Sequence, residues 1–109
     1  MLITSDKLIS ENPELVKKFL EATRKGYLDC IQDPDGAAEI LAKQIPEYDV
    51  EYLKLSQRYL SEKYMEGNER WGEMKAEVWD NYTEFMLEYG LIPHALKAED
   101  AFTNEFLPE

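Results

Sequence analysis

Apolar residues recur at three- and four-residue spacing along most of the chain, and this pattern predicts a mainly helical protein. The first long helix begins with Asn12 as its N-cap and Pro13 in its first turn, two residue types favoured at those positions. Asp33-Pro34 ends this helix and starts the next one. The apolar face of the first long helix comprises Leu15, Val16, Phe19, Leu20, Thr23, Tyr27 and Ile31.

Two shorter helices follow. Asp33 is suited to cap a helix over residues 34–44, which Pro46 follows as a stop signal. Asp49 is suited to cap another helix that extends to about Ser61. Residues 62–72 contain two glycines and an asparagine and are expected to form a loop.

A fourth helix is predicted over residues 74–89, with Gly90 as a left-handed C-terminal stop. One apolar stripe runs along it, and Trp79 and Met86 flank that stripe, so this helix is expected to form the core. Trp71 precedes the helix and either covers the core or lines a groove. The stripe residues are Met74, Val78, Tyr82, Phe85 and Tyr89, of which Val78, Tyr82 and Phe85 are expected to be buried.

The two ends of the chain complete the predicted architecture. LITS at residues 2–5 is a short β-capable run that needs a partner strand. The C-terminal tail combines a short helical turn at residues 98–102 with an extended end. The expected fold class is mainly α, with about four helices plus a short N-terminal strand, in a single domain over residues 1–109.

The charge of the chain argues against two classes of partner. The formal net charge is −11 and the isoelectric point is near 4.5, so phosphate backbones and anionic lipid headgroups are both repelled. No apolar run approaches the roughly 20 residues that a membrane span requires. The N-terminus lacks the basic start and apolar core of a signal peptide.

No set of residues predicts catalysis. The serines (Ser5, Ser10, Ser56 and Ser61) have no flanking nucleophile-elbow glycines, and the only histidine, His94, lies in a predicted loop. Cys30 has no neighbouring cation that would lower the pKa of its thiol, and it is interpreted as a small buried hydrophobe. Glu47, Asp49 and Glu51 lie in polar surroundings and are interpreted as caps and surface charge.

No metal or cofactor site is predicted either. DPDG at residues 33–36 resembles part of a calcium loop, but the alignment places Ile31 at the first ligand position and Ala42 at the last. Helix capping accounts for Asp33 and Asp35 better. A single histidine without nearby cysteines does not indicate a transition-metal site.

The order of motifs along the chain resembles the C-terminal portion of solute-binding proteins of ABC importers. The similarity is to the branch for thiamine-pyrimidine precursors, related to the nitrate, sulfonate and taurine binders. The first half carries Ser5-Asp6, Asn12-Pro13-Glu14, Phe19-Leu20-Glu21-Ala22, Asp33-Pro34 and Ala37-Ala38. The second half carries Trp71-Gly72, Trp79, Phe85-Met86, Gly90-Leu91-Ile92 and the segment from Phe102 to Pro108.

The resemblance implies a type II periplasmic-binding-protein fold, of which this chain would be about the last third. It also implies an extracytoplasmic location, an ABC permease as partner and a small solute bound only by the full-length parent. The matched positions are caps, core residues and helix stops, so the resemblance transfers no ligand-contact residue and implies no enzyme activity. Two alternatives stay open: a stand-alone acidic helical interaction module, and a fragment of a thiamine-pyrimidine synthase.

Self-association is expected through the N-terminal strand. An unpaired strand at residues 2–5 would offer its backbone groups to another chain, and Ile3, Leu8 and Ile9 would lie beside that edge. Salt screens the repulsion between two acidic copies. A two-fold homodimer is therefore predicted.

Overall fold

The computed structural model describes all of residues 1–109 and contains helices without any strand. The mainly helical prediction is confirmed, and the predicted loop over most of residues 62–72 is observed. The helices are α1 (Asp6–Glu11), α2 (Pro13–Gln32), α3 (Pro34–Ala42), α4 (Val50–Lys63), α5 (Ala76–Glu88) and α6 (Ala98–Ala101).

The predicted N-caps are confirmed. The Asn12 side chain accepts a hydrogen bond of 3.2 Å from a backbone amide in the first turn of α2. The Asp33 carboxylate accepts one of 3.0 Å at the start of α3, and Asp49 accepts two, of 2.9 and 3.0 Å, at the start of α4. Because each cap satisfies an amide that has no partner within its helix, these side chains fix where the three helices begin.

The predicted strand at residues 2–5 is absent. Residues 1–5 have no regular structure, and Ser5 is the N-cap of α1, a short helix that the sequence pattern did not predict. The Ser5 hydroxyl accepts a hydrogen bond of 3.2 Å from the Leu8 amide. A lone β-capable run has no neighbouring strand here to bond with, whereas a capped helical turn satisfies its amides locally.

The end of α5 follows the prediction, and its start does not. Gly90 has φ = 64°, and the amides of Gly90 and Leu91 bond back to the carbonyls of Leu87 and Met86 in a Schellman arrangement. The helix begins at Ala76, two residues later than predicted, because the backbone of Met74 is hydrogen-bonded to another part of the chain.

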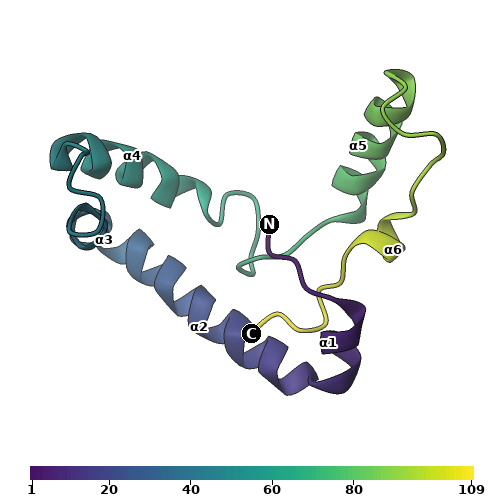
Figure 1. Ribbon diagram of the computed structural model, residues 1–109, viewed down its shortest axis with the longest axis horizontal. Coiled ribbons are helices and arrows are strands. Elements are labelled where there is room, and N and C mark those ends of the chain that lie inside the picture. The colour runs from purple at the N-terminus through teal and green to yellow at the C-terminus, as the bar shows by residue number, and fades with distance from the viewer.

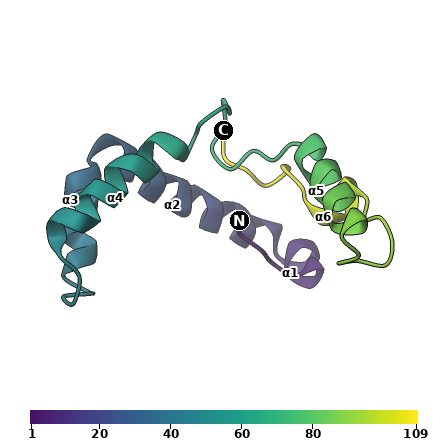
Figure 2. The ribbon, with the colours of Figure 1, turned by 90° about the horizontal axis from the view of Figure 1, so that it is seen from above.

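The helices form an open V (Figure 1). Helix α2 is the longest element, with α1 beside its start, while α3 and α4 pack on each other and against α2. Helices α5 and α6 pack together and form the second arm, and the view from above shows α3 and α4 at one end of an arch and α5 and α6 at the other (Figure 2). The loops between α4 and α5 and the C-terminal tail connect the arms.

Polar contacts hold the first arm together. The buried Ser61 hydroxyl of α4 donates a hydrogen bond of 2.8 Å to the carbonyl of Cys30 in α2. On the outside, the Arg58 guanidinium binds both carboxylate oxygens of Asp35 at 2.6 and 2.5 Å, which joins α4 to α3. The hydrogen bond from Arg58 lowers the pKa of Asp35 below its ordinary value. The Lys54 ammonium lies 2.8 Å from Glu39, and that bond raises the pKa of Lys54.

The chain is more open than a compact domain of its length. Its Cα radius of gyration is 17.2 Å, against about 13 Å for a compact domain of this size. Many large apolar side chains are exposed, so burial within the chain uses only part of the apolar surface that the sequence provides. The buried residues are Ala38, Leu53, Ser61, Trp71, Thr83 and Ala98.

Candidate functional site

Trp71 lies at the junction of the two arms and is buried, with 7% of its surface exposed. The centroid of its ring is 5.3 Å from that of Tyr27 in α2, and Tyr27 meets Tyr64 edge-to-face at 4.7 Å. Edge-to-face and tilted aromatic pairs are favourable beyond the area they bury. Trp71 thus packs in an aromatic cluster with Tyr27 and Tyr64, which we call the Trp71 cluster. Of the two roles considered for Trp71, this packing is the one that covers a core.

The C-terminal tail is bound to the segment that follows Trp71. The side-chain amide of Asn104 accepts a hydrogen bond of 3.0 Å from the Met74 amide and donates one of 2.8 Å to the Met74 carbonyl. The Arg70 guanidinium donates a bond of 3.0 Å to the carbonyl of Leu107. Gly72, with φ = 80°, allows the Leu107 side chain to approach closely. The tail is therefore a fixed strap between the arms.

A small cavity lies beside the Trp71 cluster. Its volume is about 70 Å³, well below the roughly 300 Å³ at which pockets for small organic ligands begin. It has room for water-sized groups only. Its walls are Arg24, Leu28, Met65, Glu69, Arg70, Trp71, Pro108 and Glu109.

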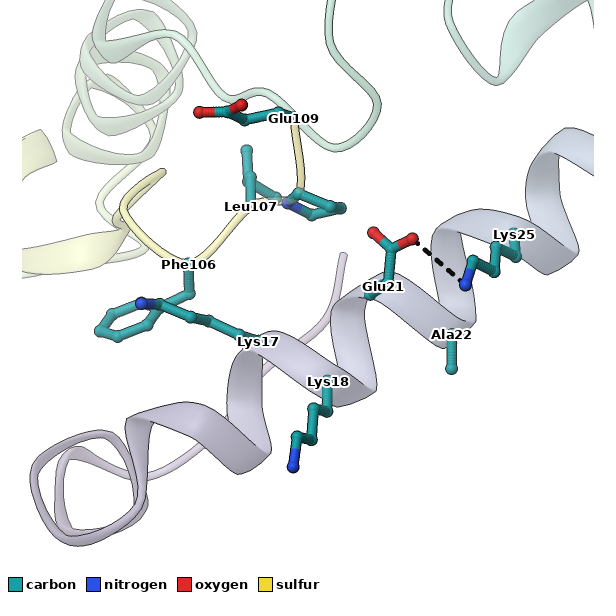
Figure 3. Close-up of a pocket in the computed structure, with 9 residues that line it drawn as sticks. Lys17, Lys18, Glu21, Ala22, Lys25, Phe106, Leu107 and Glu109 are labelled. Carbon is teal, nitrogen blue, oxygen red and sulfur yellow. Dashed lines mark ion pairs between the residues drawn. The ribbon is translucent and has the colours of Figure 1, made fainter.

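A larger groove of about 500 Å³ runs between α2 and the tail (Figure 3). Lysines from α2 form one wall, and Phe106, Leu107 and Pro108 form the other. Two of the lysines are already paired, Lys17 with Glu14 at 3.4 Å and Lys25 with Glu21 at 3.4 Å. Figure 3 shows Lys18 pointing away from the tail, and the residues that line the groove come from two segments only, α2 and the tail. A solute lying in it would keep much of its surface in water, and affinity for small ligands depends on enclosure.

Helix α5 uses only one edge of its apolar face for packing within the chain. Trp79, Thr83 and Met86 are spaced by four and three residues, and we call them the inner row of α5. Thr83 is buried, Trp79 and Met86 are half-buried, and the Trp79 ring stacks on Phe102 with centroids 5.8 Å apart. The inner row is the contact between α5 and the segment around α6.

The predicted core stripe of α5 is exposed. Val78 is 64% exposed, Tyr82 57%, Phe85 48% and Tyr89 64%. We call these four residues the outer row of α5. Within it, the centroid of the Phe85 ring lies 6.4 Å from that of Tyr82 and 4.7 Å from that of Tyr89. The prediction that Val78, Tyr82 and Phe85 are buried in this chain is therefore wrong. Periodicity defines an apolar face, but it does not show which half of that face has a neighbour.

The residues considered for catalysis have structural roles or lie apart. Ser5 caps α1, Ser10 donates to the Lys7 carbonyl, and Ser61 joins α4 to α2. His94 is exposed in the loop after α5. No hydrogen bond connects any of these serines to the imidazole.

The aspartates of the DPDG segment are also engaged. Asp33 caps α3 and Asp35 pairs with Arg58, so both carboxylates are used within the fold. No cluster of three or more His, Cys, Asp or Glu side chains is arranged to share a metal ion. None of the helices combines the length and apolar character needed to cross a bilayer.

Comparison with known proteins shows what this chain is similar to. Residues 1–37 match the family model described as NMT1/THI5 like. The chain is 33% identical to the riboflavin-binding protein RibY of Chloroflexus aurantiacus, over 98% of its own length and 32% of that protein. It is 28% identical to the formylaminopyrimidine-binding protein of Halalkalibacterium halodurans, over 95% of its own length and 33% of that protein.

The chain thus spans about a third of the length of the curated relatives it matches. Both relatives are named as binding proteins, and neither is named as an enzyme. These matches confirm that the chain resembles part of a solute-binding protein of an ABC importer, with the NMT1/THI5-like match over its first 37 residues.

Proposed function

We propose that this chain serves as the helical, C-terminal part of a solute-binding protein that delivers a small solute to an ABC permease outside the cytoplasm. The observation that carries the proposal is the match of nearly the whole chain to a continuous third of two binding proteins. In this role the helices pack against a binding lobe and stabilise it, and other parts of the protein supply most of the solute pocket.

The geometry of the chain favours a structural role over solute binding by this chain alone. The α2–tail groove has walls on two sides only, and the cavity beside the Trp71 cluster is too small for a heterocycle. Solute-binding sites bury most of their ligand's surface, which requires walls on opposite sides. Residues 1–109 alone should therefore bind the solute negligibly.

We infer that the solute is a thiamine-pyrimidine precursor, in line with the order of motifs along the chain and the similarity to the formylaminopyrimidine-binding protein. Riboflavin is the second candidate, because the riboflavin-binding relative has the higher identity, 33% against 28%. Both solutes are planar nitrogen heterocycles, so either would be held by stacking and hydrogen bonds at a closed site.

Two hybrid proteins test the proposal. In each, residues 1–109 replace the matching third of one relative, either the riboflavin-binding protein or the formylaminopyrimidine-binding protein. Calorimetry should show that each folded hybrid binds the solute of its parent, while the isolated chain gives no heat with formylaminopyrimidine, riboflavin or taurine. The hybrid that keeps more of its parent's affinity identifies the better solute class.

Two results would overturn the proposal. The first is a folded hybrid that binds no solute, which would favour a stand-alone helical interaction module. The second is micromolar binding by the isolated chain, which would show that the open groove suffices. A variant with Phe106→Ala in the isolated chain would then report whether the groove between α2 and the tail is the binding site, because Phe106 belongs to the tail wall of that groove.

A further inference from the structure

We propose that the outer row of α5 is a docking surface for the remainder of a solute-binding protein. That remainder would contact the outer row with an apolar patch of its own, bordered by basic side chains. The inference rests on the proposed function and specifies where the rest of such a protein contacts this chain. The outer row consists of Val78, Tyr82, Phe85 and Tyr89.

The first argument is that α5 has too little support within the chain. It has 13 residues, and isolated helices of about 12–15 residues are only marginally stable in water. Its N-cap, Lys75, forms no side-chain capping bond, and its only packed helical neighbour is the four-residue α6. Most helices are stabilised by packing of their apolar face, and for α5 only the inner row is packed.

The second argument is the chemistry of the exposed face. Three of its four side chains are aromatic, each about half exposed or more, and they form one continuous row of contacts. Aromatic side chains are enriched at the centres of interfaces because they bury a large area with few rotatable bonds. A continuous apolar row of this kind on a helix is typical of a contact surface.

The third argument concerns charge and selects among occupants. Glu77, Glu84 and Glu88 run alongside the outer row, all are exposed, and the ion pairs of the structure all involve other residues. A second copy would bring the same three carboxylates against them, on a chain of net charge −11. A partner with lysine or arginine at the border of its apolar patch would instead be attracted.

The length of the relatives identifies that partner. Each binding protein has about two thirds of its length outside the matched region. The second arm is joined to the first only through the Trp71 cluster and the tail. The outer row of α5 is therefore free to contact the remaining two thirds of such a protein. The partner is therefore the remainder of the binding-protein fold, which covers α5 when both parts are present.

The riboflavin-binding hybrid described above provides the test. Tyr82→Ser together with Phe85→Ser should lower the urea midpoint of the hybrid and increase the binding of an apolar dye. Leu87→Ser is the matched control, because Leu87 is on the same helix, is 36% exposed and lies on the side opposite the outer row. A hybrid in which the double variant changes the midpoint no more than Leu87→Ser would overturn the inference.

Charge reversal gives an independent readout. Glu84→Lys together with Glu88→Lys should lower the urea midpoint at low salt, and the loss should shrink as salt is added, because screening weakens the lost attraction. A midpoint that stays the same or rises at low salt would contradict a basic border on the partner.

Hydrogen exchange in the isolated chain keeps the inference testable should a hybrid fail to fold. The amides of α5 should exchange faster than those of α2, because α5 lacks its partner. Equal protection of α5 and α2 in a monomer would show that α5 needs none. A dimer lost on Phe85→Ser would assign the surface to a second copy, against the inference.

Solute binding is recorded separately in every hybrid. A hybrid that is stabilised through α5 but binds no riboflavin would refute the proposed function and support the docking surface. A hybrid that binds riboflavin and is insensitive to the outer-row variants would support the proposed function and refute the docking surface.

Discussion

Asn104→Ala is expected to detach the C-terminal tail from the loop before α5. Asn104 is half-buried and uses both ends of its side-chain amide, one on the amide and one on the carbonyl of Met74, at 3.0 and 2.8 Å. Each intramolecular hydrogen bond contributes about 1 kcal/mol, and leaving a part-buried backbone group unpaired adds about 1 kcal/mol or more. The free energy of unfolding should fall by about 2–4 kcal/mol.

Urea denaturation followed by tryptophan fluorescence is a suitable assay, because Trp71 and Trp79 lie on either side of the lost contact. Asn104→Asp is the informative companion, since it keeps an acceptor for the Met74 amide and loses the donor to the Met74 carbonyl. Asn81→Ala, at an exposed position of α5, is the control and should change stability by less than about 0.5 kcal/mol. An Asn104→Ala variant as stable as that control would refute the assignment of the tail as a fixed strap.

Three further predictions follow from local geometry. In the isolated chain, Trp79→Ala should lower the free energy of unfolding by about 2 kcal/mol, because the Trp79 ring is stacked on Phe102. Phe85→Ala should lower it by less than about 1 kcal/mol, because Phe85 is 48% exposed. Urea denaturation would show the larger loss for Phe85→Ala if Phe85 belonged to the core. Asp35→Asn should destabilise the chain near neutral pH only. The lowered pKa of Asp35 means that its contribution is present above the ordinary carboxyl pKa and is lost as the pH falls through the lowered one, so thermal melts of variant and wild type should converge in strong acid. Gly72→Ala should cost about 1–2 kcal/mol because φ is 80° and Leu107 lies 3.0 Å from the added carbon, and an unchanged melting temperature would contradict this.

Helix positions were largely predictable because they depend on local chemistry. Asn12, Asp33 and Asp49 cap the helices that were predicted to follow them, and Gly90 ends α5 in the expected left-handed conformation. The sequence pattern does not predict α1, because Ser5-Asp6 also fits the end of the β-capable run at residues 2–5. The predicted dimer through that strand has lost its structural basis, and the oligomeric state stays a prediction.

The contacts that define the candidate surfaces were not predictable from periodicity. Val78 and Trp79 are adjacent apolar residues, and only the position of α6 and Phe102 makes Trp79 the packed one. The two hydrogen bonds between Asn104 and Met74 join residues 30 positions apart, and nothing in the local sequence indicates that pairing. Such long-range contacts depend on the whole arrangement of the chain, as does the burial of Trp71 against Tyr27.

The most direct test of the central claim is a calorimetric titration of riboflavin into the hybrid that carries residues 1–109 in place of the matching third of the Chloroflexus riboflavin-binding protein. The isolated chain and the relative without that third serve as baselines. If this chain performs the structural role of the matched third, the hybrid binds riboflavin and neither baseline does. A hybrid that folds cooperatively and gives no heat of binding would contradict the claim.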